Sequence, residues 1–255
     1  MNPDLQALIT TLEMAAITTI ILLLIGTPLA WYLAKMTSRF KVIIEAVVAL
    51  PLVLPPTVLG FYLLIAFSPD KLPGQLWQQV TGQQLAFSFS AIVIGSVLYS
   101  LPFVVQPLQK AFEQLGDSLL EAGALLGAGP IDRFFSIVLP LTKASFITAA
   151  SLGFAHTVGE FGIILMIGGN IPGETRVLSI ALFDHVEAFD YARAHILAIS
   201  LLISSLVLLA SIYLLNLPAR SLAKGANKTP SDTSNNTPSN TSSNNNKIQK
   251  SGDLR

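Results

Sequence analysis

The sequence predicts an all-α polytopic membrane protein with five transmembrane helices, and three observations favour this fold class. Hydrophobic residues make up 52% of the 255 positions, and the mean hydropathy is +0.63. Charged residues make up only 12% of the chain, whereas about 25% is usual in a soluble domain. Five apolar stretches are each long enough to cross a bilayer, which takes about 20 helical residues. A chain with so few charged side chains could not cover a globule in water.

The five apolar stretches follow one another along most of the chain. We place them at residues 12–34, 42–67, 86–108, 144–168 and 195–217. The first has Glu13 only at its outer edge, and the fifth is rich in Leu and Ile with few helix breakers. None of them alternates apolar and polar residues, as strands of a membrane barrel do. Helices are therefore the predicted form of all five spans.

The three middle spans contain residues that interrupt a helix. These residues are Pro51, Pro55, Pro56, Pro102, Pro107, Gly153, Gly159 and Gly162. A proline removes an N–H donor and frees a carbonyl one turn earlier, and such breaks are tolerated only against protein or a wet cavity. We therefore expect the second span, with Pro51, Pro55 and Pro56, to be kinked and to line a pathway. The alternative is a kink that serves packing alone.

The basic residues predict the orientation of the spans, because loops inside the cell carry an excess of Lys and Arg. The loops on one side carry Lys35, Arg39, Lys41, Lys110, Arg133, Lys143, Arg220, Lys224 and Lys228. The loops on the other side carry only Lys71, Arg176 and Arg193. The N-terminus is thus predicted outside and the C-terminus inside. Residues 1–224 form the predicted transmembrane domain. At residues 225–255 the composition changes to Asn, Ser, Thr and Pro, which predicts a disordered cytoplasmic tail.

The composition also argues against several classes of function. The formal net charge is +0, so nothing indicates a nucleic-acid partner, and no cysteine is available as nucleophile or metal ligand. The three histidines do not cluster at metal-ligand spacing, and we expect neither a metal site nor catalytic residues. No Gly-x-x-x-x-Gly-Lys-Ser/Thr loop occurs, so the chain is not expected to hydrolyse ATP.

The loop at about residues 109–143 is the most informative segment of the sequence. Helical spacing of apolar residues runs from Ala111 to Leu125, and Gly127 and Gly129 end that helix. Gly127 allows a tight turn, because glycine enters left-handed backbone space without a steric penalty. The sequence therefore predicts two short helices that form a compact, rigid knob on the cytoplasmic side. The alternative is an amphipathic helix that lies on the membrane surface.

The same loop resembles the cytoplasmic signature of the permeases of binding-protein-dependent ABC importers. The matching residues, with the family's spacing, are Glu121, Ala122, Gly123, Gly127, Ile137, Leu139 and Pro140. The family usually has Ala at the third position, where this chain has Gly123. The resemblance implies a type I importer permease whose loop inserts a coupling helix into a groove on a separate ATP-hydrolysing subunit.

Two further segments resemble permeases of molybdate importers in particular. They are the proline-rich stretch 50–60 and the stretches 159–162 (Gly-Glu-Phe-Gly) and 169–176 (Gly-Asn-Ile-Pro-Gly-Glu-Thr-Arg). Sulfate permeases share the first of the two glycine-rich stretches but differ in the second. The resemblance covers residues 5–217 and implies transport of molybdate, and of tungstate as an oxyanion of the same charge and shape. A sulfate-type permease is the alternative.

His156 and Glu160 are candidate gating residues of the fourth span. They lie four residues apart on one face of the predicted helix, and ionisable groups within a span are costly. One interpretation is a hydrogen-bonded pair that fixes packing; the other is that Glu160 braces a seam beside the passage. Glu160 is not expected to bind an anion directly, because like charges repel.

The external segment from Gly169 to Arg193 is the expected dock for a binding protein. Apolar residues recur there at near-helical spacing, and Glu174 and Arg176 are available for contacts at the rim. The alternative is a surface helix that caps the bundle, and both can hold.

The resemblance implies an assembly in the cytoplasmic membrane. It comprises a second copy of the chain, two ATPase subunits, an extracytoplasmic oxyanion-binding protein and the surrounding lipid. The chain would bind no cofactor itself, and ATP would be used by the ATPase. A secondary transporter is the main rival, but it would normally show inverted repeats and a coupling-ion site. Only the proximity of His156 to Glu160 favours it.

Overall fold

The computed structural model of the protein describes residues 2–226. Every regular element of this part is a helix, and the chain divides into two units, Met1–Leu217 and Pro218–Arg255. The first unit contains α1 to α10 and most of α11. The tail predicted at 225–255 lies outside the described residues except for its first two positions.

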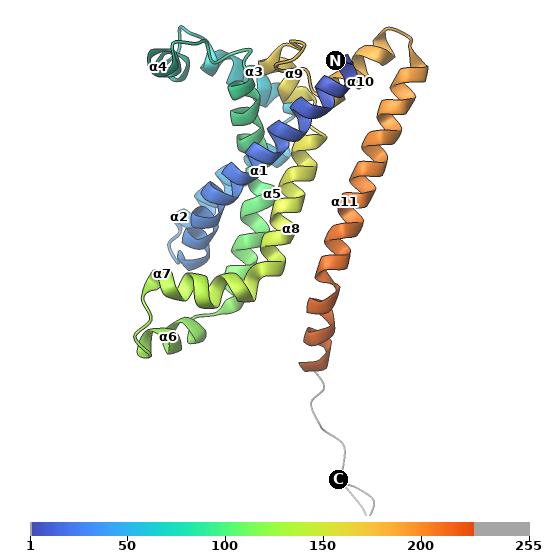
Figure 1. Ribbon diagram of the computed structural model, residues 1–255. Helices are drawn as coiled ribbons and strands as arrows, with labels where there is room; N and C mark the ends of the chain where they lie inside the picture. Colours follow the sequence, from blue (N-terminus) through green and yellow to red (C-terminus); the bar gives the residue numbers. More distant parts are fainter. Residues whose placement is uncertain (1, 227–255) are drawn as a thin grey trace, which may run out of the picture. The chain divides into compact units, whose positions relative to one another are not determined.

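The helices follow one another with short connections (Figure 1). Their bounds are α1 (Pro3–Lys35), α2 (Phe40–Val53), α3 (Pro56–Phe67), α4 (Leu72–Thr81), α5 (Phe89–Leu115), α6 (Ser118–Leu125), α7 (Pro130–Arg133), a π-helical turn (Phe134–Val138), α8 (Leu139–Val158), α9 (Gly162–Gly168), α10 (Leu178–Glu187) and α11 (Tyr191–Ala226).

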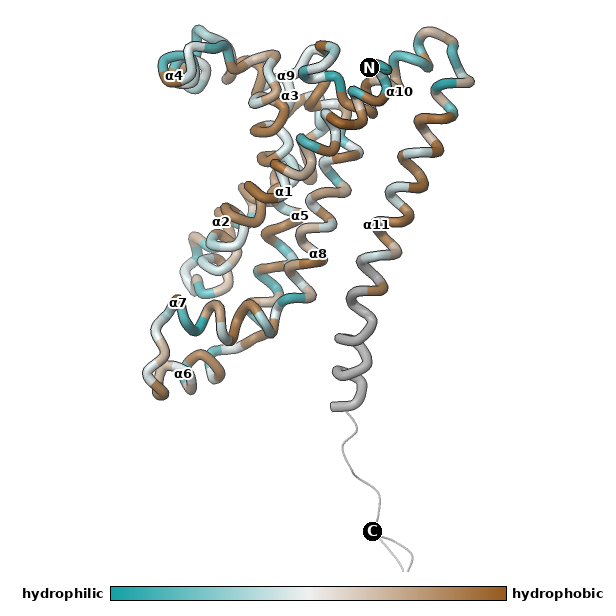
Figure 2. Tube along the Cα trace, viewed as in Figure 1, coloured by the Kyte–Doolittle hydropathy of each residue, from teal (hydrophilic) through white to brown (hydrophobic). Residues whose placement is uncertain are grey.

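Four helical segments of the described chain are long and apolar enough to cross a membrane. They are Pro3–Lys35, Phe89–Leu115, Pro130–Val158 and Tyr191–Ser211. The pair α2 and α3 qualifies as a fifth, broken span. Figure 2 shows hydrophobic residues along these helices, whereas hydrophilic residues gather at α4 and in the connections at the ends of the bundle. Five spans are therefore present when the bent pair is taken as one.

The centre of the first unit is the contact of α5 with α1 and α8 (Figure 1). Two glycines allow the close approach. A Cβ added to Gly26 of α1 would lie 3.1 Å from Val104 Cγ1, and one added to Gly153 of α8 would lie 2.9 Å from Val104 Cγ2. Val104 is fully buried between them. Helices in a membrane associate largely through van der Waals packing, and small residues at their contacts let the backbones approach closely.

The interruption of the second span is stronger than the kink that the sequence predicts. α2 and α3 are bent by 109° at the break. Leu54 and Pro55 both have extended backbone, with ψ of 135° and 136°. The residue before a proline is disfavoured in the helical region, and Leu54-Pro55-Pro56 places two such residues in succession. The chain therefore turns sharply and restarts a helix at Pro56, where a missing N–H costs nothing.

The fourth span differs from the prediction at both ends. The helical segment begins at Pro130, well before residue 144, and α8 ends at Val158 rather than near residue 168. Gly159 and Gly162 flank the break, and glycine is unfavourable inside a helix by about 1 kcal/mol relative to alanine. Residues Gly162–Gly168 form a separate helix, α9, which packs against α3.

Candidate functional site

The signature loop consists of α6, α7 and the π-helical turn, and its tight turn depends on Gly127. α6 ends with two backbone bonds, from Gly127 N–H to the Ala124 carbonyl (2.9 Å) and from Ala128 N–H to the Gly123 carbonyl (3.0 Å). This is the Schellman arrangement, which requires left-handed backbone at the residue after the cap. Gly127 has φ +86°. The glycine of the signature is therefore explained by backbone geometry.

The helix predicted from Ala111 to Leu125 is in fact divided in two. α5 continues to Leu115, and Gly116, with φ +71°, separates it from α6. The apolar spacing continues across this turn, so periodicity alone could not reveal the division. The knob is consequently α6 followed by α7, and it hangs directly from the end of α5.

Gly123 and Ile137 of the signature contact each other. A Cβ added to Gly123 would lie 2.8 Å from Ile137 Cδ1 and 3.3 Å from Arg133 Cγ. The Arg133 guanidinium also donates a hydrogen bond to the Leu120 carbonyl (3.1 Å). The two halves of the signature thus hold each other, and the small residue at position 123 lets them approach.

A brace of one ion pair and several aromatic contacts fixes the loop to the ends of α1 and α5. The Lys35 ammonium pairs with the Asp117 carboxylate and lies 5.3 Å from the Trp31 ring centroid. The Trp31 ring meets the ring of Phe112 at 5.2 Å and that of Phe134 at 5.9 Å, both edge to face. Edge-to-face pairs contribute about 0.5–1.5 kcal/mol beyond their buried area. These contacts tie the loop to α1 and α5, so a movement of the loop is expected to displace both helices.

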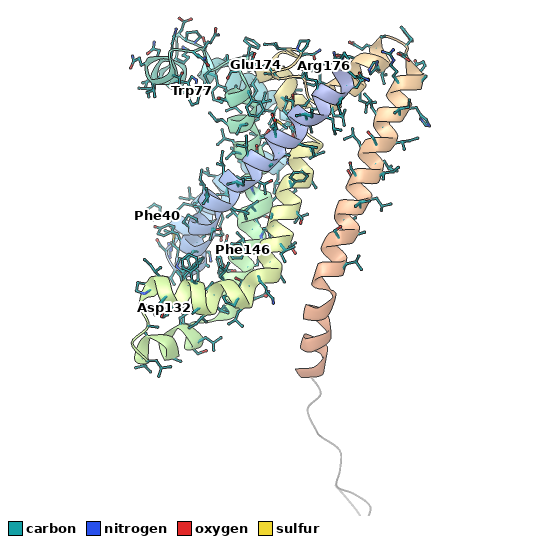
Figure 3. All side chains as sticks on the ribbon, in the orientation of Figure 1. Phe40, Trp77, Asp132, Phe146, Glu174 and Arg176 are labelled. Carbon is teal, nitrogen blue, oxygen red and sulfur yellow. The ribbon has the colours of Figure 1, made fainter. Side chains whose placement is uncertain are left out.

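The tip of the loop exposes apolar side chains that its own chain does not cover. Leu125 is 90% exposed, Leu126 89% and Ile131 73%. Glu121 and Ala122 lie on the exposed side of α6, and Asp132 marks the start of the second half of the loop in Figure 3. An exposed apolar patch on a rigid support is typical of an interaction surface.

The proline break brings together two segments singled out in the sequence. A Cβ added to Gly162 would lie 2.9 Å from Pro56 Cβ, and one added to Gly60 would lie 2.9 Å from Met166 Cβ. α3 therefore packs tightly on α9, with Pro56 against the end of the Gly-Glu-Phe-Gly stretch. Pro55 forms the extended corner, and Pro51 lies one turn earlier within α2.

The predicted pair of His156 and Glu160 on one helical face is not formed, because α8 ends before Glu160. The His156 Nδ1 lies 2.9 Å from Ser100 Oγ, and its ring stacks on Phe103 with centroids 4.0 Å apart. The Tyr99 ring lies 4.8 Å away. His156 thus joins α8 to α5 and does not contact Glu160 in the described chain.

Glu160 instead supports the break between α8 and α9. Its side chain is buried, and Oε1 accepts the N–H of Ile163 (3.1 Å). The Ser179 hydroxyl donates to the Glu160 carbonyl (2.6 Å), which ties the break to α10. A carboxylate satisfies backbone donors at the start of a helix, so the geometry gives Glu160 a positioning role.

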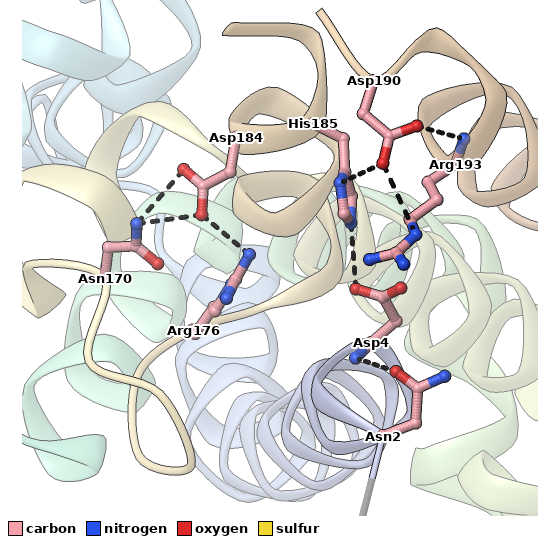
Figure 4. Close-up of polar contacts among 8 residues, drawn as sticks. All are labelled: Asn2, Asp4, Asn170, Arg176, Asp184, His185, Asp190 and Arg193. Carbon is pink, nitrogen blue, oxygen red and sulfur yellow. Dashed lines mark hydrogen bonds and ion pairs between the residues drawn. The ribbon is translucent and has the colours of Figure 1, made fainter. Parts of the chain in front are cut away.

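The external segment holds one of its two predicted docking residues in an internal ion pair. The Arg176 guanidinium lies 2.9 Å from Asp184 Oδ2, and the Asn170 amide donates to the same carboxylate (3.1 and 3.2 Å) (Figure 4). Glu174, in contrast, is exposed and has no side-chain partner among the described residues (Figure 3). Glu174 is therefore available at the rim, and Arg176 mainly fastens its own loop to α10.

Two threonines to which the sequence analysis assigned no role close this external loop, although Thr175 belongs to the stretch 169–176 that carries the resemblance. The Thr175 hydroxyl donates to the Gly168 carbonyl (2.6 Å) and accepts from the Ile171 N–H (2.9 Å). Thr11 of α1 accepts the N–H of Leu178 (2.8 Å) at the start of α10. Local patterning does not reveal these hydrogen bonds, since the partner of Thr11 is determined only by the packing of the helices.

The charged residues beside α10 complete the external network. His185 Nε2 lies 3.1 Å from Asp4 Oδ1, and its Nδ1 lies 3.8 Å from Asp190 (Figure 4). The Asp4 N–H donates to Asn2 Oδ1 (3.1 Å). The start of α1 is thus joined to α10, and the external segment is one connected cap over that end of the first unit.

At the other end of α5 lies a polar cluster that sequence reasoning missed. This α2–α5 polar cluster consists of Lys41, Glu45, Gln109 and Glu113. The Gln109 amide donates to Glu45 (2.5 Å) and to Glu113 (3.0 Å), and the Lys41 ammonium lies 2.8 Å from Glu113. The feature of the sequence that could have revealed this cluster is Glu45, a carboxylate inside the apolar stretch 42–67. An acid within a span is costly without such partners.

Comparison with known proteins places this geometry in a family context. Residues 26–221 match the family model described as "Binding-protein-dependent transport system inner membrane component". The chain is 57% identical over 210 residues to the "Molybdenum transport system permease protein ModB" of Azotobacter vinelandii, covering 82% of this chain and 93% of that protein. The protein of the same name from Escherichia coli is 33% identical over 211 residues, covering 81% and 92%.

More distant likenesses extend the comparison. A "Probable sulfate transport system permease protein cysT" of Anthoceros angustus is 34% identical over 201 residues, covering 79% of this chain and 69% of that protein. Among solved structures, a chain of the bacterial alginate ABC transporter in complex with an alginate-bound periplasmic protein superposes with a TM-score of 0.69 at 14% identity. That match covers 86% of this chain and 80% of the other.

Proposed function

The chain belongs to the family of binding-protein-dependent transport system inner membrane components, and from this premise we propose that it is the molybdate-carrying permease subunit of an ATP-driven importer. The protein is a multi-pass protein of the inner membrane and part of a binding-protein-dependent transport system. Beyond this family membership, we propose which substrate is transported, that ATP supplies the energy, and which subunits form the assembly.

The proposed substrate rests on one observation. The chain is 57% identical to a molybdenum permease, over 93% of the length of that protein. The sulfate permease of Anthoceros angustus is 34% identical to the chain, but the molybdenum permease of Escherichia coli is no more similar, at 33%. The more distant matches therefore do not separate the two substrates, whereas the near one favours molybdate. Tungstate, with the same charge and tetrahedral shape, is the expected second substrate.

The exposed knob supports coupling to a separate ATPase. Its tip offers the apolar Leu125 and Leu126, and its base is braced to α1 and α5 by Lys35 and Trp31. The second half of the knob runs into α8 without interruption. A push on the tip would thus reach three packed spans together. The exposed carboxylate of Glu121 is suited to a charge-assisted contact with the ATPase.

The proposed assembly contains two copies of this chain, two ATPase subunits that use ATP, and an extracytoplasmic oxyanion-binding protein. The connected cap of the external segment, with Glu174 at its rim, is suited to receive the binding protein. The break at Pro55 and Pro56, supported by Glu160 through α9, lets α2 and α3 face different parts of a passage. Closure of the ATPases would move the knobs and change access from one side to the other.

Uptake in proteoliposomes tests the proposal. Vesicles containing the chain with its ATPase, supplied with binding protein, are expected to accumulate labelled molybdate only when ATP is present on the ATPase side. Glu121→Ala is expected to abolish uptake while the protein remains inserted, because the contact with the ATPase is lost. Accumulation driven by an ion gradient without ATP would instead identify a secondary transporter.

The sulfate alternative is separated in the same vesicles by competition. Excess unlabelled tungstate is expected to suppress molybdate uptake strongly, and excess sulfate only weakly. The reverse order, with labelled sulfate as the better substrate, would replace molybdate by sulfate in the proposal and leave the permease role intact.

A further inference from the structure

Two hollows on one side of α5 share the same two polar residues. The smaller, of about 220 Å³, is lined by Leu52, Phe103, Gln106, Lys110 and Leu152 together with Pro102 and Pro107. The larger, of about 490 Å³, lies beside the α2–α5 polar cluster and is also lined by Gln106 and Lys110. The hollows therefore adjoin along α5, and these two side chains form their common wall.

Gln106 and Lys110 lie on the same face of α5 as the two aromatic residues that contact His156. Tyr99, Phe103, Gln106 and Lys110 are spaced by four, three and four residues, so they fall on one face of α5 and span about 16 Å along it. The ring of His156 of α8 stacks on Phe103 and also contacts the tilted ring of Tyr99. The face is thus aromatic at one end and polar at the other, and its polar end lies toward the knob.

The hydrogen bonds around His156 leave its neutral ring without a free N–H to donate to an anion. The Thr157 hydroxyl donates to the Gly153 carbonyl (2.9 Å), so the Ser100 hydroxyl donates to Thr157 (3.2 Å). Ser100 must then accept from the Nδ1–H of His156 (2.9 Å). Nε2 of the neutral ring is left as an acceptor. The His156 ring therefore offers an oxyanion no donor, whereas Gln106 and Lys110, further along α5, each carry N–H donors.

The acids near Lys110 are engaged by other groups. Glu113 accepts from Lys41 and Gln109, and Glu45 accepts from Gln109. The cluster and Lys110 together hold two carboxylates and two ammonium groups, so their formal charge is balanced. Glu113 also feels the charge of Lys110, but within the described chain no ion pair or hydrogen bond joins Lys110 to a carboxylate, and Gln106 makes no side-chain hydrogen bond. No close contact therefore holds either side chain away from a ligand in the hollows.

We propose that Gln106 and Lys110 contact the oxyanion on its way to the cytoplasmic side, between the aromatic wall of α5 and the α2–α5 polar cluster. The inference rests on the proposed function. In a two-fold dimer the anion would meet two ammonium groups and two amides, which match the charge and acceptor oxygens of a divalent tetrahedral oxyanion. The balanced cluster beyond them prevents the strong trapping that would stop conduction.

Substitutions at the two positions test this assignment in the vesicles described above. Lys110→Gln and Gln106→Leu are each expected to lower the rate of ATP-driven molybdate uptake about tenfold, since a hydrogen bond to a charged group is lost. Lys110→Arg is expected to retain most of the rate. Lys143→Gln and Gln114→Leu make the same chemical changes at exposed positions on α8 and α5 that line neither hollow, and they are expected to transport normally.

The absence of cysteine allows a second, independent measurement. Gln106→Cys and Gln114→Cys each introduce a single thiol, and an anionic thiol reagent is added to inside-out vesicles. Molybdate is expected to slow the labelling at position 106 and to leave the labelling at position 114 unchanged.

Either of two results would overturn the assignment. One is full uptake by both Lys110→Gln and Gln106→Leu, and the other is equal loss of uptake in the Lys143→Gln control. If the unsubstituted protein itself showed no ATP-dependent molybdate uptake, the proposed function would fail instead, so the two failures are distinguishable.

Discussion

At the scale of single residues, glycines determine whether the signature loop can form. Gly127 has φ +86° in the turn after α6, whereas Gly129, two residues later, has φ −66° and is the N-cap of α7. No atom lies within 4 Å of a Cβ added to either residue. Space is therefore equal at the two positions, and only the backbone conformation differs.

This difference makes a matched pair of substitutions informative. Gly127→Ala is expected to destabilise the loop by about 1–2 kcal/mol, because L-residues are unfavourable in left-handed backbone. Gly129→Ala is expected to be neutral. Limited proteolysis of the loop in inside-out vesicles measures the effect, with faster cleavage expected for Gly127→Ala alone, together with lower uptake. Equal cleavage of the two variants would show that the turn does not need glycine.

At the scale of elements, the brace between α1, α5 and the knob decides whether the loop can move the spans. Trp31 is its centre, since it contacts Phe112 of α5, Phe134 of the π-helical turn and Lys35 of its own helix. Phe146 of α8 extends the cluster, with its ring 6.0 Å from that of Phe112 (Figure 3). Three spans therefore share one aromatic joint.

Trp31→Ala is expected to uncouple ATP hydrolysis from transport. Loss of two edge-to-face contacts removes about 1–3 kcal/mol from the joint, so the loop can shift without moving α1. The molybdate taken up per ATP hydrolysed is expected to fall several-fold in the vesicles. Trp77→Ala removes the same side chain from α4, away from the knob (Figure 3), and should leave this ratio unchanged. An unchanged ratio in Trp31→Ala would mean that coupling does not pass through the brace.

At the scale of the whole molecule, the two ends of the first unit carry different chemistry. One end has α4 and the external cap of Arg176, Asp184 and His185, and the other has the knob and the α2–α5 polar cluster (Figure 1). The excess of basic residues at the second end predicts that it faces the cytoplasm. Every role proposed for the knob depends on this orientation.

Single introduced thiols test the orientation directly. Gln78→Cys on α4 is expected to react with a membrane-impermeant reagent in spheroplasts, because α4 is predicted outside. Leu125→Cys at the tip of the knob is expected to react only in inside-out vesicles. Labelling of Leu125→Cys in spheroplasts would place the knob outside and would exclude its contact with an ATPase.

The sequence by itself determined the features that depend on neighbouring residues. The number of spans follows from the length and hydropathy of each stretch, and the break at Pro55 and Pro56 follows from proline stereochemistry. The knob was predictable because Gly127 and the spacing of the signature act within one short segment. For the same reason the substrate family could be inferred from short stretches of residues.

Only the tertiary structure decided which distant residues meet. The separation of Glu160 from His156, the ion pair of Arg176 with Asp184, and the common wall of Gln106 and Lys110 all depend on where helices end and how they pack. A helical stretch in the sequence specifies which of its residues share a face, but not which partner covers that face. In a membrane, hydropathy does not determine which helices pack together, since lipid and protein are equally apolar. The partner is determined by close packing at small residues such as Gly26 and Gly153.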